Sequence, residues 1–328
     1  MRGLIVSMPS AINEVKKVLS NYSSFEVTTE LGNDLSGYDI IGIVGTDRFI
    51  IMNLHRLNSW DGPILTVGFG ISFLNSIDIT SLDKAIPNII TGNYDTEEIL
   101  RLAVDIKGKR LPNAVNEVAI FPAKSAITIE YSLYVNGEYV WHDVADGLIV
   151  STPTGSTAYA MSAGGPLIHS RARVLEIVTV NSTNLARVPI IVPSDSTIEI
   201  RDLISRSRVE IIIDGSIRSY AGSEVRIMSG RPIKLIRIGN MSSSIGRYEK
   251  KLSLLSNMDL PPSAKFILKI LEYEGQLTQK EIMEKTMLPS RTVRNALNIL
   301  IRKGLIKRQV ILRGNKEVAI YSLPSMSR

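Results

Sequence analysis

Over residues 1 to about 100, short apolar runs alternate with segments whose apolar residues recur at helical spacing. Gly3–Ser7, Tyr38–Val44 and Pro63–Val67 are apolar enough to form buried strands, and the second and third are followed by glycine. After the first strand, Ser10 is expected to cap a helix over 12–19, which places its apolar residues on one face. This alternation of strands and helices is typical of a parallel α/β layer.

From about Asn113 onward, apolar runs occur without helical spacing, and turn residues such as Asn136-Gly137 separate them. The predicted strands are Glu117–Ile120, Ser125–Val135, Glu138–His142, Val174–Val180, Thr197–Ile200 and Val209–Ile213. We expect this region to form a β-sandwich or a folded antiparallel sheet. A last apolar strand is predicted over 232–238, and a short closing helix over 242–255.

After Pro261-Pro262, which marks a boundary, the pattern predicts three helices and a hairpin. The first helix covers 263–273, and Thr278 with Glu281 forms a capping box for the second. Ser290 is expected to cap the third helix, which ends before Gly304 and buries one apolar stripe. The segment 307–323 then alternates around a basic tip at 313–316.

This order of elements resembles the winged helix-turn-helix family. The resemblance implies that the third helix enters a DNA major groove and that the hairpin, or wing, touches phosphates. By analogy, the candidate contacts to double-stranded DNA are Arg291, Thr292, Arg294 and Asn295 in the helix, and Arg313 and Lys316 in the wing. The alternative is a winged helix used for protein pairing.

The charge distribution supports DNA binding. Residues 258–328 contain 13 Lys and Arg against 6 Asp and Glu, a net charge of +7. The chain has 38 basic and 32 acidic residues in total, so positions 1–257 hold 25 and 26, a net charge of −1. The whole basic excess is therefore in the last segment, which is the pattern of a module that meets a polyanion, although a solvated basic face would also produce it.

Composition excludes several classes of protein. The apolar fraction is 44% and the charged fraction 21%, ordinary values for a globular protein, and no apolar run approaches the roughly 20 residues that span a bilayer. There is no cysteine, and the three histidines, His55, His142 and His169, do not have metal-ligand spacing. We therefore expect a cytoplasmic protein without disulfides, membrane segment or resident metal site.

The stretch DGLIVSTPTGSTAYAMSAGGPLI, residues 146–168, concentrates small hydroxyl side chains and glycines directly after a buried strand. Glycine lets a ligand approach the backbone closely, and short hydroxyl groups supply directional hydrogen bonds with little bulk. Such a loop suits a ligand that carries ribose hydroxyls, amides and phosphates. For the composition alone, a tight polar turn would be the simpler interpretation.

The same stretch resembles the signature of the NAD kinase family, almost without interruption. Further family features occur in the same order: NAVNEVAI with Asn116 and Glu117, ARVPIIVPSDSTIEI, and IIIDGS with the turn Asp214-Gly215. The resemblance covers roughly residues 1–250. It implies that Asn116 and Glu117 hold the adenosine part of NAD and that Asp146 binds at the start of the signature. The pocket would be lined by Thr154, Thr157, Ala158, Tyr159 and Ser162.

The two resemblances together imply the architecture, α/β plus all-β with a C-terminal winged helix, in three parts. Residues 1–105 would form a Rossmann-like N-terminal lobe, completed by about 230–255. Residues 106–229 would form a β-sandwich-like, NAD-binding lobe, with the nucleotide site between the two lobes. Residues 258–328 would form the C-terminal winged helix. Family analogy further implies a homo-oligomer.

One motif departs from the family pattern. The family's Gly-Gly-Asp-Gly turn, which binds phosphates through its backbone, here reads Gly45-Thr46-Asp47-Arg48. The later glycine-rich turn reads VGFGISFL, with Gly68 where the family has asparagine. If the turn requires positive φ at Thr46 or Arg48, the strain would be about 1 kcal/mol or more. Arg48 could instead pair with a phosphate itself.

Two hypotheses follow. In the first, the protein is an NAD kinase in which Asp47 accepts the proton of the NAD 2′-hydroxyl, Gly45 and Arg48 contact the donor, and Mg²⁺ neutralises the phosphates of ATP or polyphosphate. In the second, it is an NAD(P)-sensing transcriptional regulator with weak or absent catalysis. A kinase for another substrate is a third option, against which the match around Tyr159 argues.

Overall fold

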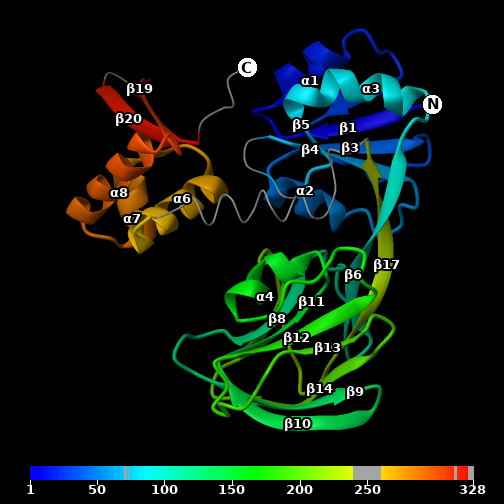
Figure 1. The fold of residues 1–328 in the computed structure, drawn as a ribbon, viewed down its shortest axis with the longest axis vertical. Helices are drawn as coiled ribbons and strands as arrows, with labels where there is room; N and C mark the ends of the chain where they lie inside the picture. The colour runs from blue at the N-terminus through cyan, green and yellow to red at the C-terminus, as the bar shows by residue number, and fades with distance from the viewer. Residues whose placement is uncertain (70–71, 73, 239–259, 314–315, 324–328) are drawn as a thin grey trace.

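The structure, a computed structural model, describes residues 1–69, 72, 74–238, 260–313 and 316–323, without the side chains of 269, 272, 273 and 311–317. Figure 1 shows two lobes joined by a pair of long strands, and a smaller module of helices with a hairpin. The α/β lobe, the β-rich lobe and the winged helix that the sequence predicted are all present. Among the described residues, no helix is both long and apolar enough to cross a membrane.

The first lobe has a parallel sheet in the order β2-β1-β3-β4. Its strands are β1 (Gly3–Ser7), β2 (Phe25–Thr28), β3 (Ile40–Gly45), β4 (Pro63–Gly68) and the short β5 (Ile77–Asp78). Its helices are α1 (Ile12–Leu19), α2 (Asp47–Leu54), η1 (Ile79–Ser81) and α3 (Leu82–Ile90). Helices α1 and α3 pack on one face of the sheet and α2 on the other, because β1, β3 and β4 present apolar residues on both faces. The prediction of a cap at Ser10 is wrong: α1 starts after Ala11 and has no side-chain cap.

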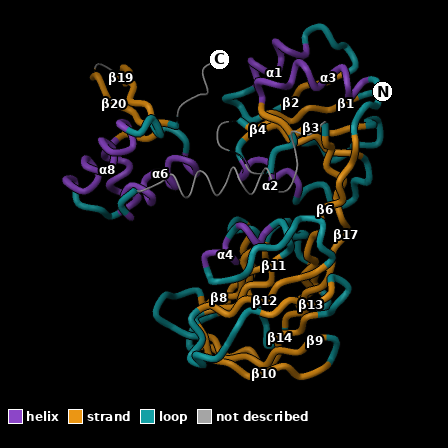
Figure 2. The backbone as a smooth tube through the Cα atoms, viewed as in Figure 1, coloured by secondary structure: helices purple, strands orange, loops and turns teal. Residues whose placement is uncertain are grey.

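Two long antiparallel strands, β6 (Asp95–Ile106) and β17 (Val225–Arg237), run from one lobe into the other, as Figure 2 shows. At one end, β17 pairs in parallel with β4, through Lys234 and Leu235. At its other end, β17 pairs antiparallel with a strand of the second lobe. The predicted strand over 232–238 is thus part of β17, whereas the predicted helix over 242–255 lies outside the described residues.

The second lobe is a β-sandwich, as predicted. One sheet has the antiparallel order β13-β12-β11-β8-β15-β16, and it faces β10-β9-β14-β17 across a core of aliphatic side chains. The strands are β7 (Lys109–Arg110), β8 (Glu117–Pro122), β9 (Ile129–Val135), β10 (Glu138–Ala145), β11 (Gly147–Ser151), β12 (Val174–Val180), β13 (Ile190–Pro193), β14 (Ile198–Ser205), β15 (Val209–Ile213) and β16 (Ile217–Tyr220). On the outer face of the six-stranded sheet, η2 (Gly155–Thr157) and α4 (Tyr159–Ser162) form a cover that buries Ala160.

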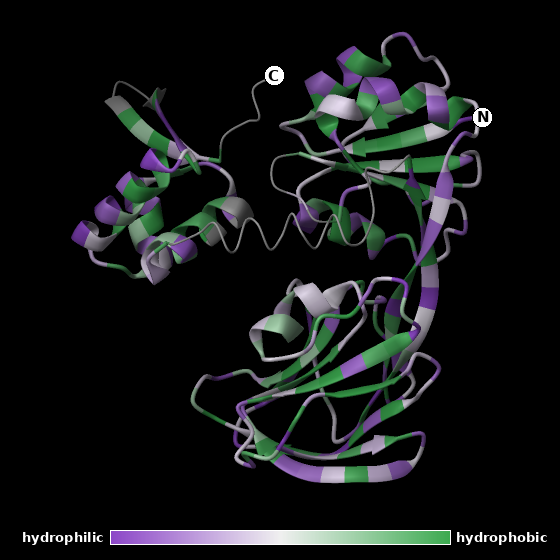
Figure 3. Cartoon of the chain, in the orientation of Figure 1, coloured by the Kyte–Doolittle hydropathy of each residue, from purple (hydrophilic) through white to green (hydrophobic). Residues whose placement is uncertain are grey.

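The third part consists of α6 (Pro262–Glu274), β18 (Leu277–Thr278), α7 (Gln279–Thr286), α8 (Ser290–Arg302), β19 (Lys307–Arg313) and β20 (Lys316–Ser322). The predicted capping box is confirmed: the Glu281 amide donates to Thr278 Oγ1 at 3.2 Å, and the Thr278 amide to Glu281 Oε2 at 2.7 Å. The predicted cap at Ser290 is wrong, because α8 starts after Pro289 and has no side-chain cap. Apolar and polar residues alternate around the helices in Figure 3, and the apolar faces form one core.

Candidate functional site

The signature loop leaves the sandwich at the end of β11, whose five residues are all buried. Its first hydroxyl, Thr152 Oγ1, donates to the Val115 carbonyl at 2.7 Å and accepts from the Gly155 amide at 3.1 Å. Ser156 Oγ donates to the Pro153 carbonyl at 2.8 Å and accepts from the Ile168 amide at 3.0 Å. These buried hydroxyls therefore fix the loop to the segment that precedes β8 and to its own far end.

Gly155 shows why the loop needs glycine. A Cβ atom at this position would lie 2.1 Å from the carbonyl oxygen of Asn116, a contact that no side chain allows. The backbone of the signature thus rests directly on the backbone of the Asn116-Glu117 pair. The two motifs that are far apart in the sequence form one surface.

Asn116 and Glu117 are held by a turn from a third part of the sequence. The Asp214 carboxylate accepts hydrogen bonds from the amides of Val115 (2.8 Å), Asn116 (2.8 Å) and Glu117 (3.0 Å). Consecutive amides that point at one carboxylate form a nest for an anion. Asp214 has φ of 46°, a left-handed conformation that aspartate tolerates. The resemblance of this turn to the family could be read from its residues, but its role could not.

Tyr159, one of the predicted pocket residues, is the first residue of α4. Its side chain is partly exposed, and its ring stacks on Phe121 with centroids 5.8 Å apart and an angle of 16° between the planes. Partial burial, then the nearby carboxylates of Glu117 and Asp146, raise the pKa of the Tyr159 hydroxyl, so it remains a hydrogen-bond donor at neutral pH. Tyr159 therefore lies within electrostatic reach of both carboxylates, although Glu117 pairs with Ser151 at one end of β11 and Asp146 precedes the other end of that strand. Asn181 Nδ2 donates to Asp146 Oδ2 at 2.8 Å.

The other predicted pocket residues follow along the same loop. Thr154 and Thr157 are half-buried, and Thr157 Oγ1 donates to the Thr154 carbonyl at 3.3 Å. Ala158 lies between η2 and α4, and Ser162 is the exposed last residue of α4. Their placement on one loop is compatible with a common ligand.

A buried carboxyl group that the sequence did not single out lies beneath this loop. Glu176 is fully buried on β12, opposite Ser151, and a Cβ at Gly165 would lie 2.2 Å from its Oε1. Within the described part of the chain, neither of its oxygens has a hydrogen-bond partner, and burial raises its pKa to about 7. Glu117 lies on the other side of Ser151 in the same row across the sheet.

The altered motif forms the start of α2. Thr46 is the N-cap, with φ of −71°, and its hydroxyl accepts weakly from the Phe49 amide at 3.5 Å. Arg48 is a helical, exposed residue of the first turn, and Gly45 is the buried last residue of β3. Neither Thr46 nor Arg48 has positive φ, so the strain considered for these two positions does not arise.

Asp47, the predicted base, is the first residue of α2. Its Oδ1 accepts from Ser72 Oγ at 2.5 Å and from the Leu74 amide at 3.1 Å. Both donors come from the second altered turn, so the two turns that depart from the family pattern hold each other. Figure 1 shows α2 on the side of the first lobe that faces the second lobe, and α4 on the facing side of the second.

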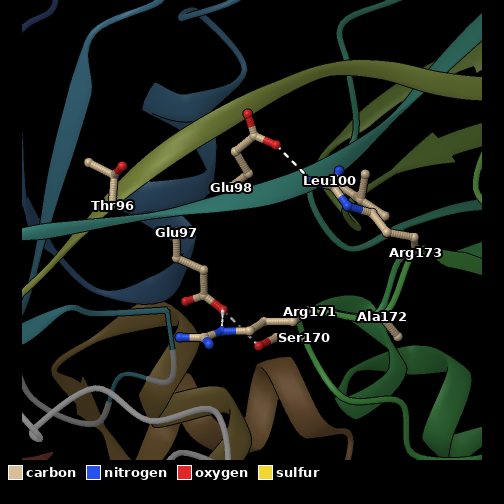
Figure 4. Close-up of a pocket in the computed structure, with 8 residues that line it drawn as sticks. All are labelled: Thr96, Glu97, Glu98, Leu100, Ser170, Arg171, Ala172 and Arg173. Carbon is tan, nitrogen blue, oxygen red and sulfur yellow. Dashed lines mark hydrogen bonds and ion pairs between the residues drawn. The ribbon is translucent and has the colours of Figure 1, made fainter.

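A cavity of about 260 Å³ lies elsewhere, between the start of β6 and the segment before β12 (Figure 4). Its polar side chains pair with one another: Ser170 Oγ donates to Glu97 at 2.9 Å, and Arg173 to Glu98 at 2.8 Å. Among the described residues that line it, none is predicted to bind NAD. Clusters of three or more His, Cys, Asp or Glu that could hold a metal ion are absent from the described residues.

On the third module, α8 presents the predicted DNA contacts. Val293, Ala296, Leu297 and Leu300 are buried, whereas Arg291, Arg294 and Asn295 are exposed and Thr292 is half-buried. The hairpin forms, since Arg313 pairs with Lys316 in the ladder of β19 and β20. The side chains of Arg313 and Lys316 lie outside what the structure describes.

Comparison with known proteins identifies both parts of the chain. The family described as the ATP-NAD kinase C-terminal domain matches residues 115–238, and the family described as winged helix-turn-helix DNA-binding matches residues 266–307. The NAD kinase of Methanosarcina barkeri is 31% identical over 264 residues, which cover 75% of this chain and 95% of that protein. The NAD kinase of Thermococcus kodakarensis is 35% identical over 204 residues, which cover 61% of this chain and 73% of that protein.

Solved structures show the same fold. An NAD kinase from Archaeoglobus fulgidus in complex with ATP has a TM-score of 0.65 and 22% identity, with 74% of this chain and 95% of that chain covered. Yeast NADH kinase complexed with NADH has a TM-score of 0.67 and 19% identity, with 79% of this chain and 88% of that chain covered. The chain therefore belongs to the NAD kinase family and carries a winged helix-turn-helix module after the kinase fold.

Proposed function

We propose that the protein transfers a phosphoryl group from ATP or polyphosphate to the 2′-hydroxyl of NAD and so forms NADP. The observation that carries this proposal is the joint geometry of the signature loop and the Asn116-Glu117 pair, which Gly155 and Thr152 lock together. The alignment covers 95% of the M. barkeri relative named NAD kinase and 75% of this chain, which supports the same activity here.

The acceptor half of the site binds NAD. Asn116 and Glu117 offer amide and carboxylate groups to the adenosine part, Tyr159 lies near the carboxylate of Glu117, and Asp146 contributes from the other end of β11. Thr154, Thr157, Ala158 and Ser162 line the same loop with short side chains. Because Asp214 and Thr152 already hold the backbone, little conformational entropy is lost when the ligand binds.

The donor half carries the chemistry. Asp47 accepts the proton of the 2′-hydroxyl, and its carboxylate is oriented by Ser72 and the Leu74 amide. Gly45 and the amides at the start of α2 face the donor phosphates, and the Arg48 guanidinium, exposed on the first turn, pairs with a phosphate oxygen.

Mg²⁺ fits this site as an ion carried by the donor. It typically takes one or two carboxylates together with phosphate oxygens, and the described residues offer Asp47 but no preformed cluster of ligands. When bound, Mg²⁺ neutralises the charge of the donor phosphates.

The test is the formation of NADP by the purified full-length protein with NAD, Mg²⁺ and either ATP or polyphosphate. We expect NADP with at least one donor. The absence of NADP with every donor, together with intact binding of NAD or NADP, would instead support the second function, an NAD(P)-sensing regulator. The replacement of two family glycines by Thr46 and Arg48, and the attached winged helix, are the features that favour that alternative.

We further propose that the winged helix binds double-stranded DNA through Arg291, Thr292, Arg294 and Asn295 on α8, and through Arg313 and Lys316 in the wing. The excess of basic residues in this module and the exposure of the arginines support it. Replacing Arg291 and Arg294 by alanine in the full chain should weaken duplex binding and reduce the slope of log K against log salt by roughly 2. Unchanged affinity and slope would show that this face serves protein pairing. A homo-oligomer remains a prediction from the family.

A further inference from the structure

A buried pair of side chains joins the two lobes beneath the candidate site. His55 Nε2 donates to Asp214 Oδ2 at 2.7 Å, and the exposed fractions of the two side chains are 4% and 0%. His55 is the residue that follows α2 in the first lobe, and Asp214 lies in the turn between β15 and β16 of the second. The contact is therefore a direct, buried connection between the lobes.

The second-lobe end of this connection carries the acceptor residues. The same Asp214 carboxylate that accepts from His55 also accepts the amides of Val115, Asn116 and Glu117. Four donors thus converge on two carboxylate oxygens. Any shift of Asp214 is transmitted to the peptide that presents Asn116 and Glu117.

The first-lobe end carries the predicted base. Helix α2 begins with Asp47 and ends at Leu54, a length of about 12 Å at 1.5 Å per residue. Arg101, fully buried on β6, donates to the Leu54 carbonyl at 3.3 Å and to the Arg231 carbonyl at 2.7 Å, which fixes the end of α2 to the two strands that connect the lobes. Burial lowers the pKa of Arg101 to about 10, so it is still a cation at neutral pH, as suits a helix C-terminus.

We propose that His55 and Asp214 are positioning residues that fix the position of Asp47 relative to Asn116 and Glu117. This rests on the proposed kinase activity. Helix α2 carries Asp47 at its start, Arg101 fixes its end to the two connecting strands, and the bond from His55 to Asp214 sets its position relative to the NAD-binding peptide. Proper distance between base and acceptor hydroxyl matters because small displacements of a reacting group reduce the rate strongly.

Substitutions of His55 and of Asp214 should have different kinetic effects. His55→Leu removes the connection but leaves Asp214 with its three backbone bonds, so NAD still binds while the base is misplaced. We expect kcat to fall at least about tenfold with KM for NAD within about threefold of the wild type. Asp214→Asn replaces one acceptor oxygen by an amide that cannot accept, so the peptide 115–117 loosens. KM for NAD should then rise about tenfold, in addition to any fall in kcat.

The experiment measures kcat and KM for NAD in full-length wild type, His55→Leu, His55→Gln and Asp214→Asn. The glutamine variant keeps a nitrogen donor near the position of Nε2 and should recover part of the turnover lost in His55→Leu, which a space-filling role would not explain. His142→Leu, at an exposed histidine of β10, is the matched control.

The outcomes separate the two claims. If His55→Leu keeps the wild-type kcat, or if it changes only KM for NAD, the positioning role is overturned and the kinase proposal stays intact. A wild-type protein that makes no NADP overturns the kinase proposal, and the positioning role with it. If His55→Leu does not fold, His55→Asn takes its place, because its shorter side chain does not reach Asp214. The same result is expected: a lower kcat with KM for NAD nearly unchanged.

Discussion

The acceptor and donor halves of the candidate site are built in different ways. In the acceptor half, backbone rests on backbone at Gly155, and the hydroxyls of Thr152 and Ser156 are buried in hydrogen bonds. In the donor half, Thr46 caps α2 and Arg48 is exposed to solvent. In the proposed function, the first half would recognise NAD through fixed main chain, whereas the second adds an exposed charged side chain where the family pattern has glycine.

This difference shows where the chain tolerates substitution. A side chain at Gly155 has no space, because its Cβ would overlap the Asn116 carbonyl. Thr46 and Arg48 have helical or extended backbone, so residues other than glycine fit there without strain. The donor half could therefore diverge from the family pattern while the acceptor half could not.

The largest expected effect is the loss of the base in the donor half. Asp47→Asn should reduce the rate of NADP formation by roughly 10²- to 10⁴-fold, the range typical of general-base catalysis, while NAD still binds. Initial rates with saturating donor and NAD measure it. Asp83→Asn, at an exposed position of the first turn of α3, should have the wild-type rate. An Asp47→Asn variant with more than a tenth of the wild-type rate would contradict the assignment.

A second substitution breaks the acceptor half. Gly155→Ala forces the signature loop away from Asn116, which should cost about 3 kcal/mol of unfolding free energy and lower NAD affinity at least tenfold. Gly32→Ala is the matched control, because the nearest atom to its Cβ is 4.0 Å away. Chemical denaturation and an NAD titration test both effects. Equal stability of the two variants would refute the close backbone contact.

A third change reports on the buried carboxyl beneath the acceptor loop. The pKa of Glu176 is raised by burial from 4.5 to about 7, so the folded protein keeps a proton that the unfolded chain releases above pH 4.5. The stability is full below that pH and decreases as pH rises toward about 7. We expect wild type to lose about 2 kcal/mol more than Glu176→Gln between pH 5 and 8. Identical pH profiles of the unfolding free energy would exclude a neutral Glu176.

The smallest effect sharpens the donor half. Arg48→Ala should raise KM for ATP or polyphosphate several-fold, since one charge-assisted hydrogen bond contributes about 1 to 2 kcal/mol, and should leave KM for NAD unchanged. Steady-state kinetics with each substrate varied in turn test this. A change confined to KM for NAD would place Arg48 in the acceptor half and contradict its proposed contact with the donor.

The sequence predicted the elements best where the periodicity was strong. The buried strands of the first lobe, the change to a β-sandwich and the capping box of Thr278 and Glu281 follow from patterns that local physics enforces. The caps at Ser10 and Ser290 were wrong because Ala11 and Pro289 take those places, and a polar residue near a helix start does not fix which residue is the cap.

The site was predictable only as far as its motifs. Asn116, Glu117 and Asp146 stood in recognisable stretches, and the fold places Asn116 and Glu117 against the signature loop at one end of β11 and Asp146 at the other end. The roles of His55, Asp214 and Glu176 were not predictable, because each depends on neighbours that are far away in the sequence. Long-range pairs of this kind leave no local pattern in one sequence.

The central claim is that the signature loop beside Tyr159 recognises a pyridine dinucleotide, and calorimetric titration of the folded full-length protein with NAD tests it most directly. We predict saturable heat with one NAD per chain, and loss of most of that heat in Gly155→Ala. Wild-type protein that is fully folded and releases or absorbs no heat with either NAD or NADP would contradict the kinase and the sensor alike.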